Sequence, residues 1–173
     1  MKWMVLALLT VVPCCSPVAV PSKGVATSIT APQASLAGYN TFSFGLADQP
    51  QPGYDVTARA LEVQRRLRPM VLQALRERGY VEHESNADFV VKLAAGTSAL
   101  PKSAGERTVT TGSVRGFIGI RIYDKRTGSE VWQGTAFGEI EPEHIDDKLL
   151  EVGVARMLAS FPTRSTPRVA AAP

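Results

Sequence analysis

The chain has 173 residues, of which 45% are hydrophobic, and its formal net charge is +3 at pH 7. This length suits one domain of ordinary size with a substantial core, and the small net charge gives no reason to expect nucleic acid as a partner. The only two cysteines are adjacent and no Cys or His cluster follows them, which excludes a disulfide framework and a zinc site within the domain.

The first residues have the pattern of an export signal. Lys2 is followed by an apolar run from Trp3 to Val12, which Pro13 ends. This run has the length of a signal-peptide core and is far shorter than the about 20 residues that a membrane-spanning helix needs. We therefore expect residues 1–15 to be a signal peptide.

The cysteines Cys14 and Cys15 directly follow this apolar run, where a bacterial lipoprotein carries its diacylglycerol. The surrounding residues resemble a lipobox, which has Gly, Ala or Ser just before the lipidated Cys. Pro13 and Cys14 occupy that place here, so the pattern is imperfect. The hypothesis is lipidation of Cys14 or Cys15, with the membrane as partner through the lipid. The alternative is ordinary cleavage after Ala26, which would give a soluble periplasmic or secreted protein.

Both ends of the exported chain have a composition typical of unfolded segments. Residues 16–37 are mostly Pro, Ser, Ala, Thr and Val, which predicts a flexible tether, and the folded domain is expected at residues 38–162. Residues 163–173 are similar and predict a disordered tail.

The first predicted elements of the domain are a strand and a long helix. Large apolar residues alternate with small or polar ones over residues 39–46, as in a half-buried strand. Three-four apolar spacing predicts a helix over residues 57–78, and Gly79 suits its C-terminal cap. Pro69 lies inside this helix and would cost about 3 kcal/mol in a regular one, so we expect a kink or a break near residues 66–68.

The remaining elements are three strands and a helix. A strand over 87–96 precedes a polar loop at 98–113, and a hairpin follows with strands at 116–123 and 130–140 joined by a turn at 124–128. A final helix from near Pro142 ends before Pro162. The order β-α-β-β-β-α predicts an α+β fold with about four antiparallel or mixed strands and both helices on one face.

Several segments resemble a known family in their order and spacing. They are "YNTFSF" (39–44), "ALRERGY" (74–80), "ADFVVKLAAG" (87–96), "GFIGIRIYDKRTGSEVWQGTA" (116–136) and "LASFP" (158–162). Together they resemble the family called domain of unknown function 4136 over about residues 39–162. The resemblance implies a bacterial envelope protein, often a lipoprotein, for which no catalytic residues are established.

No group of residues indicates catalysis or a metal site. His83 lies in a polar stretch and His144 near the start of the last helix, so each is expected on the surface, and no Gly-Xaa-Ser-Xaa-Gly motif occurs. The acidic residues around that helix start lack the spacing of a calcium loop and favour its dipole; they are Glu139, Glu141, Glu143, Asp146 and Asp147. We therefore expect neither an enzyme nor a bound metal or cofactor.

The residues most suited to contact a partner or ligand are basic or aromatic. Arg65 and Arg66 belong to a basic face of the long helix, Arg115 follows the polar loop, and Trp132 lies in the hairpin, where the core is its ordinary place. The sequence thus favours a non-enzymatic envelope lipoprotein that binds an envelope protein through a sheet edge or the loop at 98–113. The alternative is a soluble periplasmic or secreted small-ligand carrier or hydrolase.

Overall fold

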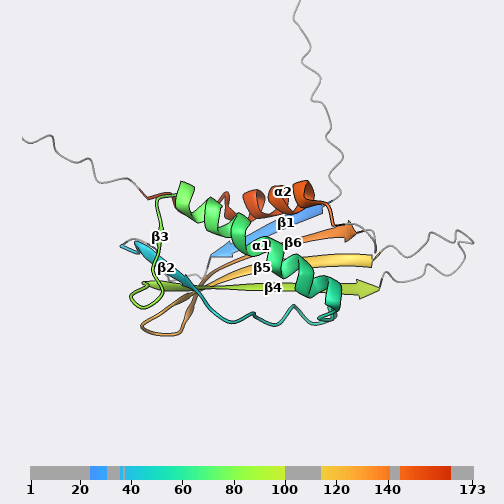
Figure 1. Ribbon diagram of the computed structural model, residues 1–173, viewed down its shortest axis with the longest axis horizontal. Helices are drawn as coiled ribbons and strands as arrows, with labels where there is room; N and C mark the ends of the chain where they lie inside the picture. Colours follow the sequence, from blue (N-terminus) through green and yellow to red (C-terminus); the bar gives the residue numbers. More distant parts are fainter. Residues whose placement is uncertain (1–23, 31–35, 37, 100–113, 141–144, 165–173) are drawn as a thin grey trace, which may run out of the picture.

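The computed structural model describes residues 24–30, 36, 38–99, 114–140 and 145–164, which form one mixed sheet with two helices (Figure 1). Among these residues the sheet has six strands in the order β1-β6-β5-β4-β2-β3. The strands are β1 (Gly24–Thr30), β2 (Thr41–Phe44), β3 (Val81–Glu82), β4 (Phe89–Ala99), β5 (Val114–Asp124) and β6 (Glu130–Ile140). Pairing is antiparallel throughout except at β2, which runs parallel to both β3 and β4.

Both helices lie on the same face of the sheet (Figure 1). α1 (Ala58–Glu77) packs on β4, α2 (Asp147–Leu158) packs on β1 and β6, and the two helices contact each other. The core between the layers is apolar and includes Phe42, Leu67, Phe89, Ile120, Trp132 and Met157. The predicted α+β class, and the placement of the helices on one face, are confirmed, although the sheet is larger than the about four strands expected.

The ends of α1 follow the sequence closely. The Thr57 hydroxyl accepts a hydrogen bond from the backbone N–H of Ala60, which caps the first turn. At the other end Gly79 has a φ of 86°, and the backbone N–H of Tyr80 donates to the carbonyl of Leu75, as in a Schellman motif. Of the kink or break predicted near residues 66–68, the break is wrong, since the helix continues through Pro69, which is exposed; the kink stays a prediction. Burial of the neighbouring apolar face therefore outweighs the local penalty.

The hairpin of β5 and β6 agrees with its prediction. The Asp124 carboxylate accepts hydrogen bonds from the backbone N–H and the hydroxyl of Thr127, and Gly128 takes a φ of 70°. The turn is thus held by a short polar side chain and a residue without Cβ.

Two terminal predictions need correction. Residues 24–30, expected in the tether, form β1, whose seven residues pair in register with β6. Arg164, expected in the tail, donates its backbone N–H to the carbonyl of Arg78 at the C-terminal end of α1. In each case pairing with a distant element orders a segment whose composition alone predicts no structure. Residues 165–173 lie outside the described residues.

Candidate functional site

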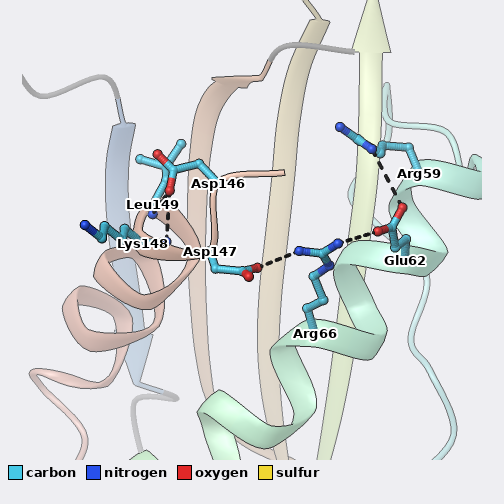
Figure 2. Close-up of polar contacts among 7 residues, drawn as sticks. All are labelled: Arg59, Glu62, Arg66, Asp146, Asp147, Lys148 and Leu149. Carbon is cyan, nitrogen blue, oxygen red and sulfur yellow. Dashed lines mark hydrogen bonds and ion pairs between the residues drawn. The ribbon is translucent and has the colours of Figure 1, made fainter. Parts of the chain in front are cut away.

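The two helices are joined by an ion-pair network that includes one of the predicted contact residues (Figure 2). Arg66 of α1 donates to Glu62, one turn earlier, at 2.7 Å and to Asp147 of α2 at 2.9 Å. Arg59 adds a contact of 3.7 Å to Glu62. The hydrogen bonds from Arg66 to Asp147 and Glu62 raise the pKa of Arg66. The guanidinium therefore joins α1 to α2 and is already engaged within the molecule.

The other predicted contact residues lie apart from one another. Arg65 is exposed on α1, and Arg115 is exposed near the start of β5. Trp132 is fully buried and packs edge-on against Phe161, with ring centroids 5.3 Å apart. A side chain with no exposed surface cannot meet a partner, so Trp132 is a core residue and not a contact residue. The structure does not bring these four residues into one site.

A segment that the sequence did not single out closes one margin of the sheet. Residues 45–56, here called the edge segment, run from β2 to α1 along the outer side of β4. Backbone N–H groups of Gly45 and Asp48 donate to the carbonyls of Val91 and Leu93, both at 2.9 Å. Asp55 exchanges two further backbone hydrogen bonds with Thr97. The edge segment thus provides hydrogen-bond partners for much of the backbone on the outer edge of β4.

The edge segment also holds a polar cluster on the sheet face opposite the helices. The Asp48 carboxylate accepts hydrogen bonds from Arg121 at 3.0 Å and from the Tyr123 hydroxyl at 2.8 Å. Burial opposes ionisation of Asp48, but the hydrogen bonds from Tyr123, the Gln49 backbone and Arg121 outweigh it and lower its pKa. Burial and the bond to Asp48 raise the pKa of Tyr123 to about 12. These groups neutralise one another, so the cluster fixes the edge segment to β5.

Aromatic side chains cover the same face nearer the other end of β5. Tyr54 of the edge segment lies 5.3 Å from Phe117 and 5.8 Å from Phe137 between ring centroids. Phe117 is only 2% exposed, although neither of the two described helices covers this face. The edge segment therefore supplies part of a second, smaller apolar layer.

The opposite margin of the sheet is formed by β1, which pairs with β6 and with no other described strand. Its sequence, GVATSIT, carries neither a charged residue nor proline. In the described part of the chain no strand pairs with the outer side of β1, and unpaired backbone groups on a sheet edge can accept another strand. Sequence reasoning named a sheet edge as a binding surface but did not identify β1. The alternation of Val25, Thr27 and Ile29 with small residues is a pattern that could have indicated a strand here, but the composition of the segment predicted a tether.

The remaining predicted sites lie outside the described residues or on their surface. Cys14, Cys15, His144 and most of the loop at 98–113 fall outside them. His83 is exposed, and its Nδ1 accepts a hydrogen bond from the backbone N–H of Asn86. In the described part of the chain no group of three or more His, Cys, Asp or Glu residues is placed to hold a metal ion. No helix among the described residues is both long and apolar enough to cross a bilayer.

Residues 27–163 match the family Domain of unknown function (DUF4136), and the chain belongs to this family. The match begins within β1, which confirms the resemblance seen in the sequence and extends it towards the N-terminus. No curated protein matches the chain.

Solved structures show the same fold at low sequence identity. A PDZ domain protein from Parabacteroides distasonis is 12% identical with a TM-score of 0.59, and the match covers 83% of this chain and 37% of that one. This chain thus corresponds to little more than a third of that protein. A PelC dodecamer from Paraburkholderia phytofirmans, in a form with a single substitution, is 16% identical with a TM-score of 0.53, covering 82% of this chain and 99% of that one.

Proposed function

We propose that the chain is a non-enzymatic lipoprotein of the bacterial cell envelope, anchored through Cys14 or Cys15, which acts as a binding or structural module. The observation that carries this proposal is the start of β1 at Gly24. Ordinary cleavage after Ala26 would remove three of the seven residues of β1, whose partners in β6 are Gly138, Phe137 and Ala136. Processing at either cysteine leaves β1 intact, which favours the lipoprotein over the soluble alternative.

The position of β1 also shortens the connection to the membrane. Only residues 16–23 separate Cys15 from β1, and eight residues span at most about 28 Å. A domain on so short a connection stays close to the lipid surface. This fits a component of the inner face of the outer membrane or of the periplasmic side of another envelope membrane.

The interior supports a structural role more than that of a ligand carrier. The space between sheet and helices holds packed aromatic and aliphatic side chains, with Phe42, Phe89 and Trp132 fully buried. The charged groups of the two polar clusters described above form ion pairs within the molecule: Arg66 with Asp147, and Arg121 with Asp48. Groups engaged in this way stabilise the fold.

The similarity in fold to the PelC dodecamer supports a structural role that includes assembly. A protein with this fold, covered over 99% of its length, is a dodecamer in its crystals. The fold is therefore compatible with assembly from several copies. We include such assembly, or binding of another envelope protein, in the proposed role.

The test is the chemical state of the N-terminus after export. The full chain is expressed in a bacterium with the complete lipoprotein pathway, and the N-terminal peptide is measured by mass spectrometry. We expect a diacylated or triacylated Cys14 or Cys15 and loss of membrane association in the Cys14→Ser, Cys15→Ser double variant, while one single variant stays membrane-bound. An unmodified N-terminus at Thr27 would contradict the proposal and favour the soluble alternative.

A further inference from the structure

Among the described residues, the outer edge of β1 has none of the protection that edge strands of monomeric proteins usually have. Such strands are typically short, charged, interrupted by proline or covered by another segment. β1 has seven residues with no charge and no proline, and among the described residues it pairs only with β6. A long uncharged edge of this kind is suited to accept another strand.

The other margin of the sheet is closed. β2 and β3 have four and two residues, and the edge segment pairs with β4 beyond them. Glu82 of β3 is flanked by Arg68 and Arg76, at 3.7 and 3.6 Å. Head-to-tail addition of copies would need two open margins, whereas a closed pair needs only one.

We propose that β1 of one copy pairs antiparallel with β1 of a second copy about a two-fold axis, joining their sheets into one. If the two-fold axis passes beside Thr27, the Thr27 residues of the two copies face each other. Val25 of each copy then faces Ile29 of the other. Opposed β-branched residues favour sheet pairing, and a strand without charge brings no like charges together. The inference names the surface for the structural role proposed above and rests on that role, but it does not depend on the lipid.

The helix layer allows this arrangement. α2 lies over β1 and β6, so the two-fold axis places the α2 helices of both copies side by side. Because neighbouring strands are about 4.8 Å apart, the two helix axes come to lie about 10 Å apart, a usual distance for packed helices. Figure 2 shows Lys148 pointing away from α1, and Val152, 45% exposed, follows it by one turn. An exposed valine thus lies near the expected junction.

The first experiment measures mass by sedimentation over a range of concentrations. It uses the exported chain, residues 15–173, with Cys15→Ser so that no lipid is present. We expect a dimer for this chain, and association at least about tenfold weaker for Thr27→Lys and for Thr27→Glu, because each places like charges opposite one another. An equimolar mixture of the two variants should again dimerise, since opposite charges then face each other. Circular dichroism checks that each variant is folded.

A cross-link provides a second readout that does not require a destabilised variant. In the same chain, Thr27→Cys should form an intermolecular disulfide on mild oxidation, because residues that face each other across a strand pair are within disulfide reach. Thr30→Cys should not, since residue 30 lies opposite Gly24. A monomer at every concentration, a larger assembly, a dimer unaffected by charge at residue 27, or equal cross-linking at both positions would overturn the proposal. Each of these results leaves the lipidation test unaffected, so the two proposals can fail separately.

Discussion

At the level of single residues, Gly134 of β6 is required by the packing of the core. A Cβ at this position would overlap the Trp132 ring and lie 3.1 Å from Cβ of Met157. Trp132 has no space to move away, because it is fully buried against Phe161. We predict that Gly134→Ala lowers the free energy of unfolding by about 1–3 kcal/mol, as overpacking of a dense core does. Urea denaturation measures this loss.

Gly153 of α2 provides the matched control. A Cβ there would meet only the end of the Ile118 side chain at 3.1 Å and Cβ of Ala136 at 3.8 Å. The gain in helix propensity offsets the tight contact, so Gly153→Ala should change the free energy of unfolding by less than about 1 kcal/mol. An equal loss of stability in both variants would show that overlap with the Trp132 ring is not the cause.

Asp124 makes stability depend on pH in the acid range. Hydrogen bonds from the Tyr39 hydroxyl and the Thr127 backbone lower the pKa of its carboxyl group to about 2 from the ordinary 3.8. A pKa lower in the folded than in the unfolded state gives stability that is fully present above about pH 4 and is lost as pH falls towards 2. We predict that Asp124→Asn removes this part of the acid dependence of the melting temperature, measured from pH 2 to 5.

Tyr39→Phe separates the two contributions. It removes the hydroxyl that donates to Asp124 but leaves the bonds within the turn. The acid dependence should therefore shrink without disappearing. An acid profile of Asp124→Asn identical to that of the natural chain would contradict the assignment.

At the level of secondary structure, elements fixed by local sequence were predictable and those fixed by distant pairing were not. The signals for α1 are its three-four apolar spacing, the Thr57 cap and Gly79, and those for the hairpin turn are Asp124 and Gly128. Each signal lies within or next to the element that it predicts. β1 depends on β6, more than a hundred residues later in the chain. Its small and β-branched residues resemble a tether until that partner is known.

The candidate sites differ in the same way. Arg66 was singled out from a run of basic residues, but its partner Asp147 comes from α2, which a charge pattern within α1 cannot show. Trp132 was named as a core residue with a lesser chance of ligand contact, and the first of these is confirmed. The cluster of Asp48, Arg121 and Tyr123 was missed because Asp48 is 73 and 75 residues away from the other two in sequence and meets them only when the edge segment runs beside β4.

The contribution of β1 to the domain can be measured by truncation. We predict that a chain starting at Gly24 is as stable as one starting at Ser16, whereas a chain starting at Thr27 loses at least about 1 kcal/mol because three residues no longer pair with β6. Thermal and urea unfolding of the three chains decide this. Equal stability of all three would remove the structural argument against cleavage after Ala26.

At the level of the whole molecule, the proposed pairing and the proposed anchor restrict each other. In an antiparallel β1 pair the two Gly24 residues lie at opposite ends of the joined strands, about 20 Å apart. Each connects to Cys15 through eight residues that reach at most about 28 Å. Both lipids can enter one bilayer when the joined strands lie along its surface. The paired sheet should therefore lie flat on the membrane, with one of its faces towards the lipid.

This orientation can be tested at two exposed valines near opposite ends of the sheet. Val56 precedes α1 next to Asp55, which pairs with Thr97, and Val81 begins β3 beside Thr41. Val56 is 50% exposed and Val81 is 58% exposed. Along β4, the position beside Val56 and the position beside Val81 are about eight residues apart, a distance of about 26 Å. A dye on Val56→Cys or Val81→Cys transfers energy to acceptor lipids according to its height above the membrane.

For the lipidated chain we expect equal transfer from both positions, because a sheet lying flat holds its two ends at the same height. In the Thr27→Lys background the single copy is attached only at its Gly24 end, which is the end of Val56. Transfer from Val56→Cys should then exceed transfer from Val81→Cys. Strong inequality in the natural background would show that the molecule stands on one end and would contradict the flat pair.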